Sequence, residues 1–235
     1  MGRPRFACWI FFLLSTQDAM ATMDVKVTPK RALVNPGDEI SILCKMNTRL
    51  ELCLFKFAGA DGISLRSGRE SDDVKYVGQG LDAGECGAHI QKVDEKHHGT
   101  INCSLGAESD GIIRVGTMHL VVAIPPTKPI LKVSMGTEME SGAITYKESD
   151  QLTGTCTVRD GRPAANISWF LGEETITEGL QMPVETCMLQ NKKELCTIQQ
   201  NLTRTLQATD DKKVLRCVSS HYSFKDTPEE ATYQI

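Results

Sequence analysis

The sequence has little of what nucleic-acid-binding and membrane-spanning chains need. Aromatic residues make up only 6% of its 235 residues, and no run of basic residues occurs. The 26 basic and 30 acidic residues give a formal net charge of −4, so the chain is poorly suited to bind phosphate backbones. After the first residues, no apolar segment approaches the roughly 20 residues that cross a bilayer as a helix. We therefore expect no nucleic-acid partner and no membrane span in this chain.

The sequence motifs of catalysis and of cofactor binding are also missing. No GxSxG turn, phosphate-binding loop or dinucleotide fingerprint occurs. The best catalytic-looking cluster is His97-His98 with Asp94 and Glu95. Adjacent histidines on a turn point apart and make no metal site without further ligands, so we interpret the cluster as a solvated turn before Gly99. We expect no enzyme, no cofactor and no metal site.

The first residues are typical of a secretory signal peptide. A short basic region ends at Arg5, an apolar run follows from Phe6 through Leu14, and a small-x-small cleavage signal ends at Ala21. The apolar run is too short to span a bilayer, although a membrane anchor or a buried N-terminal helix is the alternative interpretation. We predict a signal peptide at residues 1–21 and an extracellular protein.

The number of cysteines is the most informative feature of the composition. Nine cysteines occur, and Cys8 leaves with the signal peptide, so eight remain. No CxxC pair occurs, which disfavours a zinc knuckle. An even number of cysteines in an oxidising compartment indicates four disulfides. The eight residues are Cys44, Cys53, Cys86, Cys103, Cys156, Cys187, Cys196 and Cys217.

A cluster of prolines divides the mature chain in two. Pro125, Pro126 and Pro129 lie within five residues, where they cannot form part of a sheet and instead stiffen a connector. We predict one domain at 22–124, of the V-like type, and a second at 127–235, each with four cysteines.

The outer cysteines are similarly spaced in the two halves. Cys44 and Cys103 lie 59 positions apart, and Cys156 and Cys217 lie 61 positions apart. Apolar and polar residues alternate around these cysteines, and no sustained helical stripe occurs, which predicts strands with one face on a core. The fold class that we predict is all-β, with two tandem immunoglobulin-like antiparallel β-sandwiches after the signal peptide.

The second half has the Cys…Trp…Cys spacing of an immunoglobulin sandwich. Trp169 follows Cys156 by 13 positions, so we expect its indole to cover a disulfide from Cys156 to Cys217 between the facing strands B and F. Asp211, six residues before Cys217, has the place of the acidic turn residue of such domains. Leu215 replaces the corner tyrosine.

The first half is a more divergent copy of the same pattern. Cys44 and Cys103 have the B and F positions, and we predict a disulfide between them. Strand C has no tryptophan, and we expect Phe55 and Phe57, in phase with Cys53, to fill its space.

The remaining cysteines pair most simply within their own halves. Cys53 on strand C would pair with Cys86 near the start of strand E, and Cys187 with Cys196 across a hairpin. Each bond would stabilise its domain by ~2–4 kcal/mol, with the short hairpin loop at the lower end. A free thiol or a redox pair is the alternative, but a reactive pair usually has CxxC spacing and a cationic setting.

Three sequons offer sites for N-glycosylation, at Asn102, Asn166 and Asn201. The strand phase places Asn166 and Asn201 opposite inward residues, so we expect both to face water and to carry glycans. Asn102 also points outward, but it precedes Cys103, and we expect less glycosylation there.

Several segments resemble the fasciclin III family of insect immunoglobulin-superfamily cell-adhesion glycoproteins. The longest are YVGQGLDAGECG at 76–87 and VRDGRPAANISWF at 158–170, with shorter ones at 103–106 and 120–123. They recur in order from about residue 35 to residue 233, and the Cys53–Cys86 pair is part of the resemblance.

The resemblance implies a surface glycoprotein that binds a copy of itself on a neighbouring cell, in axon guidance and epithelial contacts. The family has three extracellular immunoglobulin-like domains and then a membrane anchor. This chain ends at Ile235, within the last strand that we expect in the second domain. We therefore expect either a piece of a longer protein at the cell surface or a short secreted form.

The exposed residues of strands C and G of the first half are the candidate interface, and those that we name lie on strand C. Leu52, Leu54 and Lys56 alternate with inward residues, so we expect them to be exposed for docking with another copy or another cell-surface protein. The alternative is that the leucines pack under a neighbouring loop, because isolated surface apolar residues are normal. A soluble immune or decoy factor that binds a different ligand is the second functional hypothesis.

Overall fold

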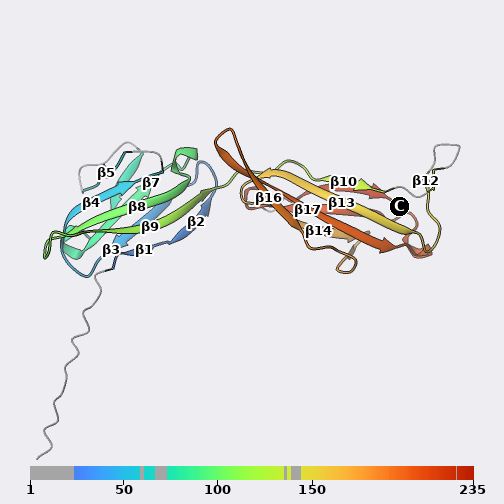
Figure 1. Cartoon of the computed structure of the whole chain (residues 1–235), viewed down its shortest axis with the longest axis horizontal. Helices are drawn as coiled ribbons and strands as arrows, with labels where there is room; N and C mark the ends of the chain where they lie inside the picture. The colour runs from blue at the N-terminus through green and yellow to red at the C-terminus, as the bar shows by residue number, and fades with distance from the viewer. Residues whose placement is uncertain (1–23, 59–60, 67–72, 135–136, 139–143, 226) are drawn as a thin grey trace, which may run out of the picture.

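The computed structural model describes residues 24–58, 61–66, 73–134, 137–138, 144–225 and 227–235, so the predicted signal peptide lies outside the described residues. Figure 1 shows two β-sandwiches that stand end to end. Only strands and short 3-10 turns occur in the part of the chain that is described. The predicted fold class of two tandem immunoglobulin-like sandwiches is confirmed.

The first sandwich packs a four-stranded sheet, in the order β1-β3-β7-β6, against a five-stranded sheet, in the order β2-β9-β8-β4-β5. All neighbours are antiparallel except β2, which runs parallel to β9. The four strands are β1 (Lys26–Thr28), β3 (Ile40–Lys45), β7 (Glu85–Ile90) and β6 (Val74–Val77). The five are β2 (Arg31–Val34), β9 (Ile113–Val122), β8 (Gly99–Ala107), β4 (Leu50–Lys56) and β5 (Ile63–Ser64), and the 3-10 turns are η1 (Leu81–Ala83) and η2 (Glu95–His97).

The second sandwich packs a sheet in the order β10-β13-β17-β16 against a sheet in the order β15-β14-β18-β19, and β11 and β12 form a separate pair. The first sheet contains β10 (Ile130–Val133), β13 (Gln151–Gly161), β17 (Lys193–Thr205) and β16 (Val184–Gln190). The second contains β15 (Glu174–Thr175), β14 (Asn166–Leu171), β18 (Val214–Ser220) and β19 (Glu229–Gln234). The small pair is β11 (Thr137–Glu138) and β12 (Ile144–Thr145), and the 3-10 turns are η3 (Ala208–Asp210) and η4 (Tyr222–Phe224).

An aromatic residue occupies the same register position in both cores. Phe55 on β4 lies directly opposite Cys103 on β8, and Trp169 on β14 lies directly opposite Cys217 on β18. Both rings are buried, and the Trp169 Nε1 donates to Gln200 Oε1 at 3.1 Å. Phe55 therefore takes the place of the tryptophan in the first sandwich, as the alternation of β4 predicts.

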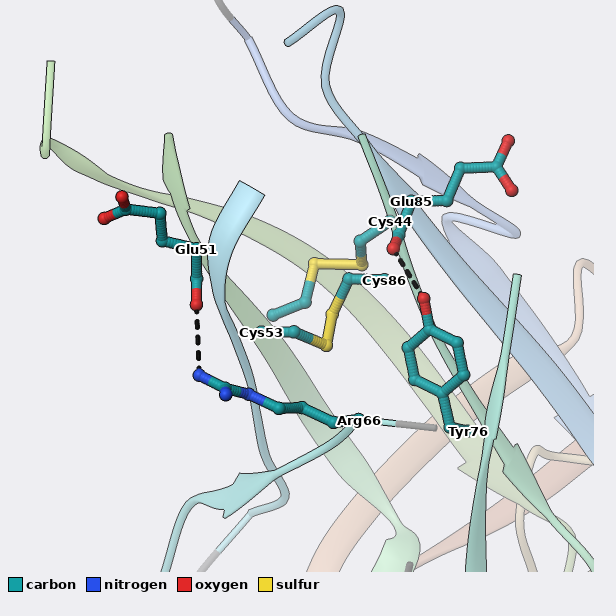
Figure 2. The surroundings of a disulfide bond; sticks show 8 residues. Cys44, Glu51, Cys53, Arg66, Tyr76, Glu85 and Cys86 are labelled. Atoms are coloured by element: carbon teal, nitrogen blue, oxygen red, sulfur yellow. Dashed lines mark hydrogen bonds between the residues drawn. A yellow bond between two sulfur atoms is a disulfide. The ribbon is translucent and has the colours of Figure 1, made fainter. Parts of the chain in front are cut away.

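Two disulfides join the sheets of the first sandwich side by side. Cys44 on β3 pairs across the ladder with Cys86 on β7, and from these positions the bonds Cys44–Cys103 and Cys53–Cys86 cross to the other sheet (Figure 2). All four cysteines are buried. Beside the second bond, the Tyr76 hydroxyl donates to the Glu85 carbonyl at 2.8 Å.

The second sandwich separates its two disulfides. Cys156–Cys217 joins the sheets inside the core, whereas Cys187–Cys196 links directly opposite residues of β16 and β17. All seven residues of β16 are exposed, so this second bond staples a surface hairpin. In Figure 1 the hairpin lies at the end of the sandwich that adjoins the first.

The two sandwiches are joined through more than the proline connector. The backbones of Ile124 and Arg162 exchange two hydrogen bonds of 2.9 Å. The Arg162 guanidinium donates from Nε to the Val122 carbonyl at 2.8 Å and binds the Glu95 carboxylate with two bonds of 2.9 and 2.5 Å. Arg162 is only 3% exposed, so we call Glu95, Val122, Ile124 and Arg162 the interdomain joint.

The acidic turn residue of the second sandwich is Asp210 and not Asp211. Asp210 is 1% exposed and lies 2.9 Å from Lys213 Nζ and 3.6 Å from Arg204, whereas Asp211 is exposed. The assignment from spacing was wrong by one residue, because η3 turns the side chain of its last residue inward. Burial opposes ionisation of Asp210, but the bonds from Lys213 and the Gln207 amide outweigh it and lower the pKa.

Candidate functional site

The expected interface residues lie on the outward side of the five-stranded sheet. Their strand, β4, pairs with β8, and β8 pairs with β9, so three strands present one surface. We call the outward side chains of these strands the β4–β8–β9 face. The rows that cross it are Leu52–Gly106–Ile113, Leu54–Ser104–Val115, Lys56–Asn102–Thr117 and Thr100–His119.

One half of the β4–β8–β9 face is apolar. Ile113 and Val115 on β9 are each 57% exposed, and they continue the rows that begin at Leu52 and Leu54. Gly106 lies between Leu52 and Ile113 and has no side chain that would project from the centre of this row. A Cβ at this position would crowd Leu52, because it would lie 3.0 Å from the Leu52 Cβ. A patch of this kind on adjacent strands is a typical docking surface.

The two leucines of this half are less exposed than their phase predicts. Leu52 and Leu54 are half-buried, and Leu54 packs against the loop at Gly62, where a Cβ would lie 3.1 Å from the leucine Cδ atoms. The alternative of packing under a neighbouring loop therefore holds in part for Leu54. Ile113 and Val115, which we did not single out from the sequence, expose more apolar surface.

The other half of the face is polar. Lys56 is exposed, and Asn102 lies between Lys56 and Thr117 on the neighbouring strands. The Thr117 hydroxyl donates to Asn102 Oδ1 at 3.0 Å, and Thr100 Oγ1 lies 3.3 Å from His119 Nδ1. The face therefore changes from apolar to polar along the strands, with a sequon in the polar half.

Charged residues hold the edges of this face. Arg114 binds Asp110 through bonds of 3.2 and 2.6 Å, which fixes the loop before β9, and its hydrogen bonds lower the pKa of Asp110. Arg66 donates to the Glu51 carbonyl at 3.2 Å and steadies β4 where its register shifts (Figure 2). Glu51 and Lys56, both exposed, give opposite charges to the two ends of β4.

The two sequons that we expect to carry glycans lie on the second sandwich. Asn166 is exposed at the start of β14. Asn201 on β17 is half-buried, where its Nδ2 donates to Gln181 Oε1 and its Oδ1 accepts from Thr155, each at 3.0 Å. They belong to different sheets and lie on a different sandwich from the β4–β8–β9 face.

The interpretation of the histidine cluster as a solvated turn was wrong. His97 is only 2% exposed, and its Nδ1 accepts from the Asp94 amide at 3.0 Å, while His98 Nδ1 accepts from the Val122 amide at 3.3 Å. Glu95 binds Arg162 of the second sandwich. Within the cluster, Glu95 belongs to the interdomain joint, and His98 binds Val122 of that joint. No sequence pattern indicated this contact, because Arg162, the partner of Glu95, lies 67 residues away.

Burial determines the protonation of these histidines. It lowers the pKa of His97, although the Asp94 carboxylate, 2.9 Å from Nδ1, favours the charged ring. It also lowers the pKa of His98, and the Arg162 charge adds to this effect. Both rings are therefore neutral at neutral pH, and they act as hydrogen-bond acceptors.

One group in the described part of the chain has the spacing of metal ligands. Donor atoms of Glu185, Cys187 and Cys196 lie within 4.8 Å of one another. The two sulfurs are bonded to each other, so neither is available as a thiolate ligand. The same residues are therefore a stapled hairpin, and nothing else about them indicates a metal site.

Comparison with known proteins identifies the chain as an immunoglobulin-domain protein. Residues 137–227 match the CD80-like C2-set immunoglobulin domain. Two solved structures share the fold at 16% identity and cover 90% of this chain: Rst D1-D2, with a TM-score of 0.59, and bovine butyrophilin, with a TM-score of 0.52, each matched over 98% of its own chain. In the described residues, no helix is both apolar enough and long enough to cross a membrane.

Three curated relatives are similar in sequence. Fasciclin-3 from Drosophila melanogaster is 32% identical over 240 residues, which cover 100% of this chain and 46% of Fasciclin-3. The CD276 antigen homolog from Xenopus laevis is 28% identical over 65% of this chain and 45% of its own length, and junctional adhesion molecule A from Felis catus is 25% identical over 59% and 40%. The chain thus spans less than half the length of each relative. Together with the domain match, this similarity shows that the chain is a fasciclin III-like protein built of immunoglobulin domains.

Proposed function

We propose that the protein is an extracellular adhesion or recognition protein whose first sandwich binds a second copy through the β4–β8–β9 face. The observation that carries the proposal is the apolar half of this face, in which Ile113 and Val115 are each 57% exposed beside Leu52 and Leu54. Similarity to Fasciclin-3 and to a junctional adhesion molecule supports adhesion as the activity.

The charges along β4 favour a second copy as the partner. Glu51 and Lys56 are exposed at opposite ends of the strand. In an isologous contact, a two-fold axis near Leu54 sets the β4 strands of the two copies antiparallel. Lys56 of each copy then faces Glu51 of the other, and the Leu54–Ser104–Val115 rows of the two copies cover each other between them. Many copies on each cell would convert one weak contact into firm adhesion.

The rest of the proposal describes the protein around this face. A signal peptide at 1–21 directs the chain out of the cell, and the domains extend over 22–124 and 127–235. Glycans on Asn166 and Asn201 would lie on the second sandwich and leave the face of the first uncovered. The contacts that we propose are neuronal and epithelial, in line with the resemblance to fasciclin III.

Beads coated with the purified two-sandwich protein test the proposal. We expect wild-type beads to aggregate, and beads with Val115→Asp to remain dispersed because a charge would be buried in the contact. Val184→Asp is the matched control, since Val184 is 63% exposed on a strand of the other sandwich. Both variants should melt like the wild type.

Two results would overturn this proposal in different ways. Wild-type beads that stay dispersed but capture another cell-surface protein would replace the homophilic partner with a heterophilic one, as for a soluble decoy. Beads with Val115→Asp that aggregate like the wild type would place the contact on another surface.

A further inference from the structure

We propose that N-glycosylation of Asn102 switches off binding through the β4–β8–β9 face, so that glycan occupancy divides the protein into an adhesive form and a silent form. This inference rests on the proposed function, and it names a regulatory modification of that same face. It differs from the expectation for Asn166 and Asn201, whose glycans would lie on the second sandwich.

The position of Asn102 within the face carries the proposal. Asn102 is flanked by Lys56 on β4 and Thr117 on β9. The next row of the same face, Leu54–Ser104–Val115, begins two residues along each strand, at a distance of roughly 7 Å. A glycan is bulky and strongly hydrated. Attached to Asn102, it would stand beside the apolar half and hold a second copy away from it.

The side chain of Asn102 can carry a glycan without losing its hydrogen bond. Thr117 donates to the Oδ1 of Asn102 at 3.0 Å, and this bond does not involve Nδ2, the atom to which a glycan is linked. Asn102 is partly exposed in the folded chain, so the linked sugar has a path to solvent. The folded sandwich therefore accommodates both forms.

The same sequon is placed where folding competes with the modification. Its middle residue, Cys103, forms the core disulfide with Cys44, which precedes it by 59 residues and is therefore synthesised first. Its strand, β8, is paired on both sides, with β4 and β9. Once this pairing and the disulfide have formed, the sequon is held extended between two strands. The middle residues of the other two sequons are Ile167 and Leu202, which make no such bond.

The transfer itself uses the lipid-linked oligosaccharide of the secretory pathway as co-reactant. The Asn102 Nδ2 forms a bond to the anomeric carbon of the first sugar, and the bond from that carbon to the lipid pyrophosphate breaks. The lipid pyrophosphate leaves with the electron pair, and the amide nitrogen loses one proton. Slower disulfide formation leaves more time for this step, so the redox state of the compartment sets the proportion of the silent form.

Variants of the sequon test the proposal. Asn102→Gln and Ser104→Ala both abolish the acceptor site, each by a different change on the face. Ser104→Thr retains the acceptor site, because threonine also has the hydroxyl that the sequon requires. Peptide mapping after enzymatic deglycosylation measures occupancy at Asn102, and bead aggregation measures binding. We expect mild reductant in the expressing cells to raise occupancy in the wild type and in Ser104→Thr. Fractions of the wild type glycosylated at Asn102 should aggregate about tenfold less than wild-type fractions without this glycan.

The outcomes separate this inference from the proposed function. If wild-type fractions without a glycan on Asn102 fail to aggregate, homophilic binding is wrong and the switch falls with it. If wild-type fractions with and without a glycan on Asn102 aggregate equally well, the switch alone is wrong. Absence of a glycan on Asn102 in every preparation, reductant included, also overturns it. The Asn166→Gln variant is the control, and its aggregation should match the wild type.

Discussion

The two sandwiches solve the same packing problem with different residues. Opposite the central cysteine, the first places Phe55 and the second places the larger Trp169. The first then adds Cys53–Cys86 next to its central disulfide, whereas the second has its extra bond, Cys187–Cys196, in an exposed hairpin. The comparison teaches that a second buried disulfide and a large aromatic residue are alternative ways to hold two sheets together.

Removal of the central aromatic residue should reveal the largest difference in stability between the two sandwiches. We expect Trp169→Ala to destabilise the second sandwich by about 5 kcal/mol and Phe55→Ala the first by about 3 kcal/mol. Trp169 has the greater effect because it is larger and its bond to Gln200 is lost, while the first sandwich retains Cys53–Cys86. Differential scanning calorimetry of the two-sandwich protein measures both transitions. Equal losses in the two sandwiches would contradict the idea that the disulfide compensates.

Removal of the extra disulfide of each sandwich should give the next largest difference in stability. We expect the double variant Cys53→Ala with Cys86→Ala to cost about 3–4 kcal/mol, and Cys187→Ala with Cys196→Ala about 2 kcal/mol or less. The first pair closes a longer loop and lies in the core, whereas β16 can detach from the sheet without opening the core. Urea unfolding of each variant measures the costs. A larger loss from the hairpin pair would show that β16 belongs to the cooperative unit.

The central disulfide of each sandwich could be predicted from the sequence for a physical reason. Strand alternation fixes which residues point inward, so Cys44 and Cys103, like Cys156 and Cys217, could be assigned to facing strands by spacing. The same periodicity predicted Phe55 and Phe57 in the place of tryptophan, and Phe55 is the one that lies opposite Cys103. Side-chain phase therefore determines most of the core, and the repeated spacing determines the number of sandwiches.

The interdomain joint was not accessible in this way. The partners Glu95 and Arg162 lie 67 residues apart on turns, and no periodic pattern connects two turns that meet only when the sandwiches stack. The same limit applies to Asp210, because a 3-10 turn does not conserve strand phase. On the candidate face, phase identified Leu52 and Leu54, but the extent of their cover by the loop at Gly62 depends on tertiary packing.

Loss of Arg162 should have an intermediate effect on stability. It tests how strongly the two sandwiches are coupled to each other. We expect Arg162→Ala to cost about 1–2 kcal/mol, because the bonds to Glu95 and Val122 are lost while Glu95 remains accessible to water. Small-angle X-ray scattering should show a wider range of shapes. Arg159→Ala is the control, since that side chain is exposed. Identical scattering from the two variants would show that the backbone bonds of Ile124 suffice.

The smallest expected difference between the two sandwiches is in how their stability responds to mild acid. Burial lowers the pKa of His97 below its ordinary 6.5, so as the pH falls through about 6.5 the unfolded chain gains a proton that the folded chain does not. The first sandwich should therefore lose stability from about pH 6.5 downward, until the pH passes the folded pKa. His98 at the joint acts in the same direction.

Once His221 is replaced, the second sandwich should not respond in that window. The lowered pKa of Asp210 contributes stability above its ordinary 3.8, and this contribution is lost only as the pH falls further, through the folded pKa. His221, whose pKa burial also lowers, is the one opposing group that we identify in the second sandwich among the described residues, so His221→Gln should accompany the test. Calorimetry at about pH 7 and about pH 5 should then show only the first transition moving down. In His97→Gln this movement should shrink, because the buried ring that resists protonation is gone; parallel movement of both transitions in every variant would instead assign the acid sensitivity to general charge.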